Sequence, residues 1–136
     1  MTDAFPVTIY HNPDCGTSRN ALAMIEAAGY APTVVEYRKV GWTRALLHEL
    51  LAAMGAKPRD VLREKGTPAA ELGLLAQGVS DASIIEAMLA HPILVNRPIV
   101  VTPKGTKLCR PSEVVLSLLE RQPDHFTKED GEIVRP

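Results

Sequence analysis

Cysteine is scarce in this sequence. Only Cys15 and Cys109 are present, and they stand far apart in the chain. In a reducing cytosol a structural disulfide between them is not expected. The four histidines are scattered and, together with the two cysteines, show no spacing typical of zinc ligands. The sequence therefore predicts neither a structural disulfide nor a bound metal.

Long apolar runs and a strong net charge are also missing. No run of roughly eighteen apolar residues occurs, so no membrane span is predicted. Residues 1–6 lack the basic flank and the apolar run of a signal peptide, and we expect a cytoplasmic location. A formal net charge of −1 creates no overall field for nucleic acid or anionic lipid, and we expect neither as a partner. Any anion site must therefore be a local cluster of cations.

The composition is that of one folded domain. The chain has 136 residues, of which 46% are hydrophobic and 23% are charged, as in soluble globular proteins. A chain of this length can bury one moderate core. We therefore expect a single domain over residues 1–136.

The N-terminal part of the chain predicts a βαβ unit. Val7–Tyr10 is rich in strand-forming residues and stops at the turn residues 11–14. After residues 15–18 the apolar spacing becomes helical, and Gly29 is a natural helix end. Thr33–Tyr37 then predicts a second strand, parallel to the first.

The middle of the chain, about residues 42–92, predicts a helical insertion. One helix has a Thr43 cap and a Gly55 end. Thr67–Pro68 has the pattern of a cap followed by proline at the first helical position, and Ser80 or Asp81 can cap a further helix.

The chain then returns to strands. Pro98–Thr102 and Thr106–Arg110 flank the turn residues 103–105 and predict a hairpin. Pro111–Glu113 opens a last helix, and the polar residues from about 122 onward predict a loose tail. The order β-α-β, helical insertion, β-β-α is that of an α/β domain with a mixed sheet, the thioredoxin-like plan.

Cys15 is the first candidate for chemistry, because it stands where a strand ends and a helix begins. The backbone N–H groups of residues 16–18 are expected to point toward the loop and to favour a thiolate and a bound oxyanion. Such surroundings lower a cysteine pKa from about 8.5 to roughly 3.5–7.5. His11 can add positive charge when protonated. The alternative is that Cys15 is a small buried apolar residue, but its polar neighbours predict exposure.

Two arginines have unusual positions. Arg97 precedes the first strand of the predicted hairpin and Arg110 closes the second, so antiparallel pairing places them side by side. Two guanidinium groups there suit a tetrahedral oxyanion. Cys109 lies on the predicted strand and is expected to be structural. Arg63 lies in a short segment that the sequence pattern does not place.

Four stretches of the sequence resemble one family. Residues 9–20, His-Asn-Pro-Asp-Cys-Gly-Thr-Ser-Arg among them, resemble the active-site loop of the glutathione- and glutaredoxin-linked arsenate reductases, the ArsC family. Residues 91–103, 108–115 and 126–131 resemble further signatures of that family, in the same order. The resemblance covers nearly the whole chain and implies a thioredoxin-like fold.

The resemblance also implies roles for individual residues. It implies that Cys15 attacks arsenic and that the oxyanion is bound by arginines, namely Arg63, Arg97 and Arg110. It assigns His11 to keeping the thiolate ionised, Ser18 to polar contacts nearby, and Pro98 to the cis-proline position that faces the cysteine.

The reaction implied is reduction of arsenate to arsenite in arsenic detoxification. Glutathione serves as co-substrate and glutaredoxin as partner, and no cofactor stays bound. Two alternatives remain open. One is a regulator of the Spx type, which binds a protein partner; Ser18 stands where such proteins can carry a second cysteine. The other is a general glutathione-dependent disulfide reductase.

Overall fold

The computed structural model describes residues 5–136. The chain forms two compact units. The first combines the residues up to Glu36 with Arg97–Pro136, and the second is Tyr37–Asn96. The second unit thus spans somewhat more of the chain than the insertion expected over residues 42–92.

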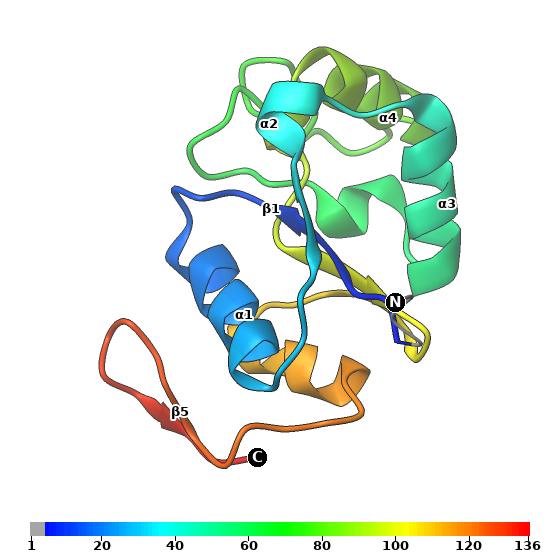
Figure 1. Cartoon of the computed structure of the whole chain (residues 1–136). Helices are drawn as coiled ribbons and strands as arrows, with labels where there is room; N and C mark the ends of the chain where they lie inside the picture. The colour runs from blue at the N-terminus through cyan, green and yellow to red at the C-terminus, as the bar shows by residue number, and fades with distance from the viewer. Residues whose placement is uncertain (1–4) are drawn as a thin grey trace. The chain divides into compact units, whose positions relative to one another are not determined.

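The first unit is built on a four-stranded mixed sheet (Figure 1). Its strands, β1 (Thr8–His11), β2 (Thr33–Glu36), β3 (Ile99–Thr102) and β4 (Gly105–Leu108), lie in the order β2-β1-β3-β4. β1 pairs with β2 in parallel, whereas the β1–β3 and β3–β4 pairs are antiparallel. The predicted α/β class and the mixed sheet are confirmed.

Helix α1 (Gly16–Ala27) makes the connection between β1 and β2. It buries Ser18, Ala21, Met24 and Ile25 along one side, with the spacing expected of an amphipathic helix. Gly29 follows the helix with a φ of 95°, which a residue with a side chain rarely adopts. The predicted βαβ unit is therefore present, and its helix begins directly after Cys15.

The predicted hairpin is also present, with a shorter turn. Thr102 pairs with Gly105, so the turn consists of Pro103 and Lys104, and Gly105 already belongs to β4. The Thr102 hydroxyl accepts from the Lys104 N–H at 3.1 Å and donates to the Leu118 carbonyl at 2.7 Å. The hairpin is thereby tied to the element that follows it.

The last predicted helix is a 3-10 helix, η3 (Ser112–Leu118). Its tighter winding, with about three residues per turn, places Val115 above Leu118 and Leu116 above Leu119. All four side chains are buried in the core of the first unit. The prediction of a helix is correct in position, and the helix is of the 3-10 type.

The prediction of a loose C-terminal tail is wrong. β5 (Phe126–Thr127) and β6 (Ile133–Val134) form an antiparallel hairpin. Phe126 pairs with Val134, and both side chains pack against the core of the first unit. The two apolar residues hold this otherwise polar segment in place.

The second unit is mostly helical. It contains α2 (Tyr37–Val40), α3 (Arg44–Met54), η1 (Pro58–Val61), α4 (Asp81–Ala90) and η2 (Pro92–Leu94). Within residues 5–136, no helix combines the length and the hydropathy that crossing a bilayer requires.

Local capping decides where the two longer helices of this unit begin. The Thr43 hydroxyl accepts from the Leu46 N–H, and the Ser80 hydroxyl accepts from the Ser83 N–H, each at 3.1 Å. Gly55 ends α3 with a φ of 63°. The predicted limits of these helices are confirmed, and the cap of α4 is Ser80.

The helix predicted after Thr67–Pro68 is absent, and residues 65–78 form successive turns instead. The Thr67 hydroxyl donates to the Arg63 and Glu64 carbonyls at 2.7 and 2.9 Å. Gly73 interrupts the segment with a φ of 74°. A regular helix does not form here because the Thr67 hydroxyl bonds to carbonyls that precede it in the chain and because Gly73 interrupts the segment.

Candidate active site

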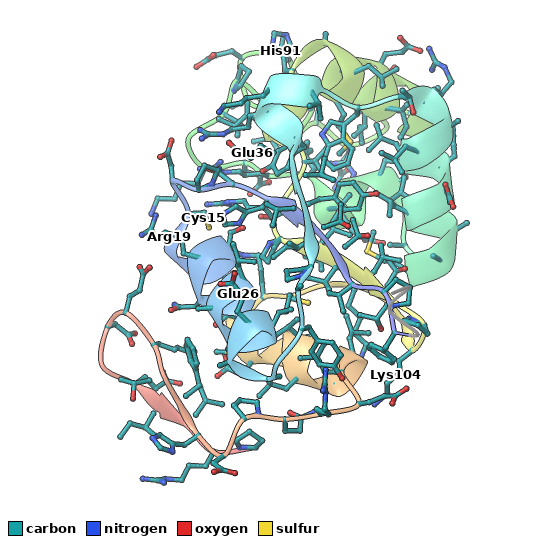
Figure 2. The ribbon with its side chains drawn as sticks, in the orientation of Figure 1. Cys15, Arg19, Glu26, Glu36, His91 and Lys104 are labelled. Carbon is teal, nitrogen blue, oxygen red and sulfur yellow. The ribbon has the colours of Figure 1, made fainter. Side chains whose placement is uncertain are left out.

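Cys15 ends the loop between β1 and α1 and is the N-cap residue of the helix (Figure 2). Asn12 builds this loop: its carbonyl accepts from the Cys15 N–H at 3.0 Å, and its side-chain oxygen accepts from the Asp14 N–H at 2.9 Å. Asn12 is one of the turn residues predicted at 11–14, but it is not among the predicted site residues. The signal was present, because asparagine before Pro13 favours a turn of this kind.

The predicted exposure of Cys15 is wrong, because the side chain is buried, with 6% of its surface accessible. The polar neighbours do not keep the thiol in water, since Asn12 and Ser18 are themselves buried. Cys15 is thus a buried thiol in polar surroundings.

The two hairpin arginines lie together, as the sequence predicts. The Arg110 guanidinium donates to the Arg97 carbonyl at 3.1 Å and, from the same nitrogen, to Cys15 Sγ at 3.8 Å. The Cys109 N–H donates to the Pro98 carbonyl at 2.8 Å and fixes the strand ends. The peptide bond before Pro98 is cis, the form that the family resemblance implies there.

Opposing effects act on the pKa of the Cys15 thiol. Burial by itself raises that pKa. The N–H group of Ser18, the charge of Arg97, the hydrogen bond from Arg110 and the N–H group of Thr17 all lower it. The net result is a pKa below the ordinary cysteine value, because donors at the helix start and the arginine charges outweigh desolvation.

His11 and Ser18 form a buried pair. His11 Nδ1 lies 2.6 Å from the Ser18 hydroxyl oxygen, which also accepts from the Asn12 N–H at 3.1 Å. Both side chains are buried. The pair links the end of β1 to the first turn of α1 and so holds both ends of the Cys15 loop.

Cys109 has the surroundings expected of a structural residue. It follows β4, is fully buried and belongs to the core of the first unit. Burial raises the pKa of its thiol to about 12. A thiol with this pKa is protonated at neutral pH and is a poor nucleophile.

Arg63 lies in the second unit. Its N–H donates to the Leu94 carbonyl at 2.7 Å, and its side-chain Nε donates to the Lys65 carbonyl at 3.0 Å. These contacts account for its local conformation within that unit. Its role in binding an oxyanion stays a prediction.

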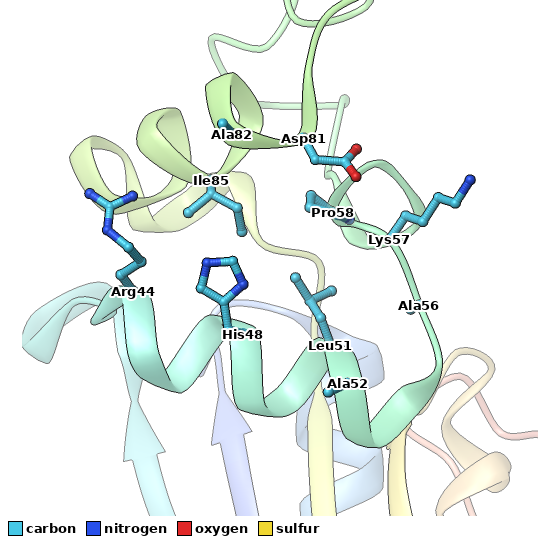
Figure 3. A pocket seen from close by; sticks show the side chains of 10 residues that line it. All are labelled: Arg44, His48, Leu51, Ala52, Ala56, Lys57, Pro58, Asp81, Ala82 and Ile85. Carbon is cyan, nitrogen blue, oxygen red and sulfur yellow. The ribbon is translucent and has the colours of Figure 1, made fainter.

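The second unit has a surface pocket of about 380 Å³ (Figure 3). His48 on α3 and Ile85 on α4 point into it, and Lys57 and Asp81 are among the residues that line it. No cysteine and none of the predicted site residues lines it. Across residues 5–136 no group of three or more His, Cys, Asp or Glu side chains is arranged to hold a metal ion.

Comparison with known proteins gives a consistent result. The model of the ArsC family matches residues 10–118. An arsenate reductase of Synechocystis sp. is 61% identical over 129 residues, which are 94% of this chain and 92% of the relative. An arsenate reductase of Escherichia coli is 56% identical over the same shares of the two chains.

A solved structure agrees with the sequence comparison. An arsenate reductase from Vibrio cholerae superposes with a TM-score of 0.81 at 38% identity, over 86% of this chain and all of the other. The fold is therefore thioredoxin-like, and the chain belongs to the ArsC family.

Proposed function

We propose that this protein reduces arsenate to arsenite, with Cys15 as the nucleophile and with Arg97 and Arg110 as ligands of the oxyanion. The observation that carries the proposal is the position of Arg110, whose guanidinium reaches both Cys15 Sγ and the Arg97 carbonyl. The similar proteins of Synechocystis and Escherichia coli, which carry the name arsenate reductase, support the choice of substrate.

Arsenate is a tetrahedral oxyanion, and the groups around Cys15 suit it. Arg97 and Arg110 supply fixed positive charge and several N–H donors. The N–H groups at the start of α1 supply further donors and the positive end of the helix dipole. We include Arg63 as a third ligand, on the family resemblance alone.

The first chemical step forms a bond between Cys15 sulfur and arsenic. The thiolate attacks arsenic(V), and one arsenate oxygen leaves as water after it takes up protons. The arginines stabilise the negative charge on the remaining oxygens while the bond forms. Arsenic is not yet reduced at this stage, because the thiolate has only replaced an oxygen ligand.

Reduction needs two electrons, which come from two thiols that become a disulfide. Ser18 stands where a loop partner cysteine would be, and Cys109 is buried with a raised pKa. The second and third thiols must therefore come from outside. Glutathione displaces a second oxygen from arsenic, which leaves as water after it takes up protons, and a glutaredoxin thiolate then attacks the glutathione sulfur. The glutathione–arsenic electron pair stays on arsenic, the mixed disulfide leaves, and hydrolysis of the Cys15 adduct releases arsenite.

His11 and Ser18 are positioning residues in this scheme. Their buried contact of 2.6 Å holds the strand end and the helix start on either side of Cys15. The surrounding N–H groups then stay directed at the sulfur. The glutathione dependence fits the proposed cytoplasmic location, where thiols are kept reduced.

A coupled assay tests the proposal. Arsenate, glutathione, glutaredoxin, glutathione reductase and NADPH are mixed with the protein, and NADPH oxidation is followed. We expect arsenate-dependent oxidation that is lost when glutaredoxin is omitted. A protein that leaves arsenate untouched but reduces a glutathione mixed disulfide would instead be a general disulfide reductase.

A further inference from the structure

The turn of the C-terminal hairpin, residues 128–131, contacts two segments of the first unit that matter for the site. Glu129 binds Arg19, which lies one helical turn after Cys15. Lys128 binds Glu113, in the element that begins just after Arg110. Adjacent residues of one turn are thus attached to the segment of the nucleophile and to the segment of its arginine partner.

Arg19 uses all three guanidinium nitrogens. Nε and Nη2 donate to the two carboxylate oxygens of Glu129 at 2.8 and 3.0 Å, and Nη1 donates to the Pro13 carbonyl at 2.8 Å. The Glu129 N–H also donates to the Asn20 side-chain oxygen at 3.1 Å. Pro13 belongs to the loop that carries Cys15, so Glu129 acts on that loop through Arg19.

Lys128 makes the second attachment. Its ammonium donates to Glu113 at 2.8 and 3.1 Å and lies 3.3 Å from the Glu132 carboxylate. The turn itself is closed by the Lys128 N–H, which donates to the Glu132 carbonyl at 2.8 Å, and by Gly131 at a φ of 93°. The two attachments therefore start from a well-defined turn.

An isolated ion pair as exposed as this one, with side-chain exposures of 44% for Arg19 and 49% for Glu129, contributes little to stability. The contact between Arg19 and Glu129 instead fixes the orientation of the Arg19 side chain. A two-point carboxylate contact fixes the plane of the guanidinium. The third nitrogen is then aimed at the Pro13 carbonyl, and this contact restrains the loop before Cys15.

We propose that residues 128–131 act as a clamp on the active site, in which Arg19 and Glu129 are positioning residues for Cys15. The clamp holds the Cys15 loop in register with the segment of Arg110. This inference rests on the proposed role of Cys15, and it predicts that the clamp sets both the reactivity of the thiol and the rate of arsenate reduction.

Two explanations of an effect at Glu129 differ in sign. If Glu129 acts only through its negative charge, Glu129→Gln removes an anion near Cys15, and the pKa of the thiol falls. If Glu129 positions the loop through Arg19, the same change releases the loop from the donors at the helix start and from Arg110, and the pKa rises. The direction of the pKa change therefore separates positioning from direct electrostatics.

The experiment compares Glu129→Gln, Arg19→Lys and the double variant with the parent protein. Arg19→Lys keeps the charge and loses the planar contact. The matched control is Asp124→Asn, on the same segment, because Asp124 is exposed and its side chain has no hydrogen bond or ion pair among the described residues. The readouts are the pH profile of Cys15 alkylation by iodoacetamide, steady-state kinetics with arsenate, and thermal unfolding.

We expect each single variant to raise the midpoint of the alkylation profile. At a pH below the midpoint, alkylation slows about threefold for a pKa rise of about half a unit. We expect kcat/KM for arsenate to fall about tenfold, as small misplacements near a reacting group do. The double variant should lose no more than the larger single loss, because both changes remove the same contact.

Three results would overturn the clamp: an alkylation midpoint that stays or falls in Glu129→Gln, losses that add in the double variant, or a lower unfolding temperature without a kinetic change. If Glu129→Gln does not fold, Arg19→Lys alone decides, by its alkylation midpoint and its kcat/KM for arsenate. Alkylation needs no arsenate. A parent protein without arsenate reductase activity would contradict the proposed function, while the alkylation profiles would still decide whether the clamp positions Cys15.

Discussion

The surroundings of Cys15 and those of Cys109 make an instructive comparison, because both thiols are buried in the same unit. The pKa of Cys109 is raised to about 12 by burial. Burial acts on Cys15 in the same direction, yet its pKa is lowered. The difference lies in the donors, since Cys15 faces the first N–H groups of a helix and two arginines, whereas Cys109 faces the apolar core.

Sequence neighbours do not explain this difference. Arg110 directly follows Cys109, but its guanidinium is bonded to Cys15 Sγ. The Arg110 N–H donates to the Leu108 carbonyl at 3.1 Å, so the chain turns tightly at Cys109 and carries the Arg110 side chain away from the neighbouring thiol. The charge that favours a thiolate is therefore delivered to the cysteine that is remote in sequence.

The largest expected effect comes from exchanging the two thiols in turn. Cys15→Ser is expected to abolish arsenate reduction in the coupled assay, because a serine hydroxyl is not ionised at neutral pH. Cys109→Ala is expected to keep most of the activity, with some loss of stability from the cavity in the core. Equal loss of activity in both variants would mean that the two cysteines form a relay, and the comparison would fail.

A smaller but clear loss is expected when the arginines near Cys15 are changed to lysine. Arg97→Lys and Arg110→Lys keep the charge and lose the planar pair of donors. If the arginines hold the oxyanion while negative charge grows on it, kcat/KM should fall more than about tenfold, equivalent to about 1.4 kcal/mol.

Arg135→Lys is the matched control, because Arg135 is exposed near the C-terminus and is not among the site residues. Steady-state kinetics and circular dichroism are measured for all three variants. Unchanged kinetics in Arg97→Lys and Arg110→Lys would show that the two residues supply only general positive charge or that they do not contribute to arsenate reduction.

The contrast between the two pKa values is accessible to alkylation. The pKa of Cys15 lies below the ordinary cysteine value, so its thiolate persists to a lower pH than that of an ordinary cysteine and is lost as the pH falls through that pKa. Iodoacetamide should therefore modify Cys15 with a midpoint below about 8.5 and leave Cys109 unmodified until the protein unfolds. Mass spectrometry after short exposure identifies the modified residue. Comparable labelling of both cysteines in the folded protein would contradict the assignment.

The smallest effect concerns stability at alkaline pH. The folded-state pKa of Cys109, about 12, lies above that of an unfolded cysteine. Its contribution to stability is fully present below the unfolded pKa of about 8.5 and is lost as the pH rises toward the folded value. Cys109→Ala should therefore flatten the decrease in the free energy of unfolding above that pH. The free energy of unfolding is measured by urea denaturation at each pH. If it falls in parallel with rising pH for variant and parent, Cys109 makes no such contribution.

The amino-acid sequence alone predicts the local elements and the parts of the site that follow from them. The Thr43 and Ser80 caps lie where their hydroxyls can reach N–H groups a turn ahead, and such contacts need no distant partner. The position of Cys15 at the start of α1 likewise follows from a predicted strand that stops at turn residues. Even the approach of Arg97 and Arg110 followed from the pairing of two neighbouring strands.

Which side chains the local elements meet depends on how these elements pack. The burial of Cys15, the aim of Arg110 at its sulfur and the folding of the tail onto α1 through Arg19 and Glu129 all join residues distant in the chain. A polar sequence predicts exposure only on average. Whether a given polar group is buried depends on whether a distant partner satisfies its hydrogen bonds, and that is fixed when the elements pack.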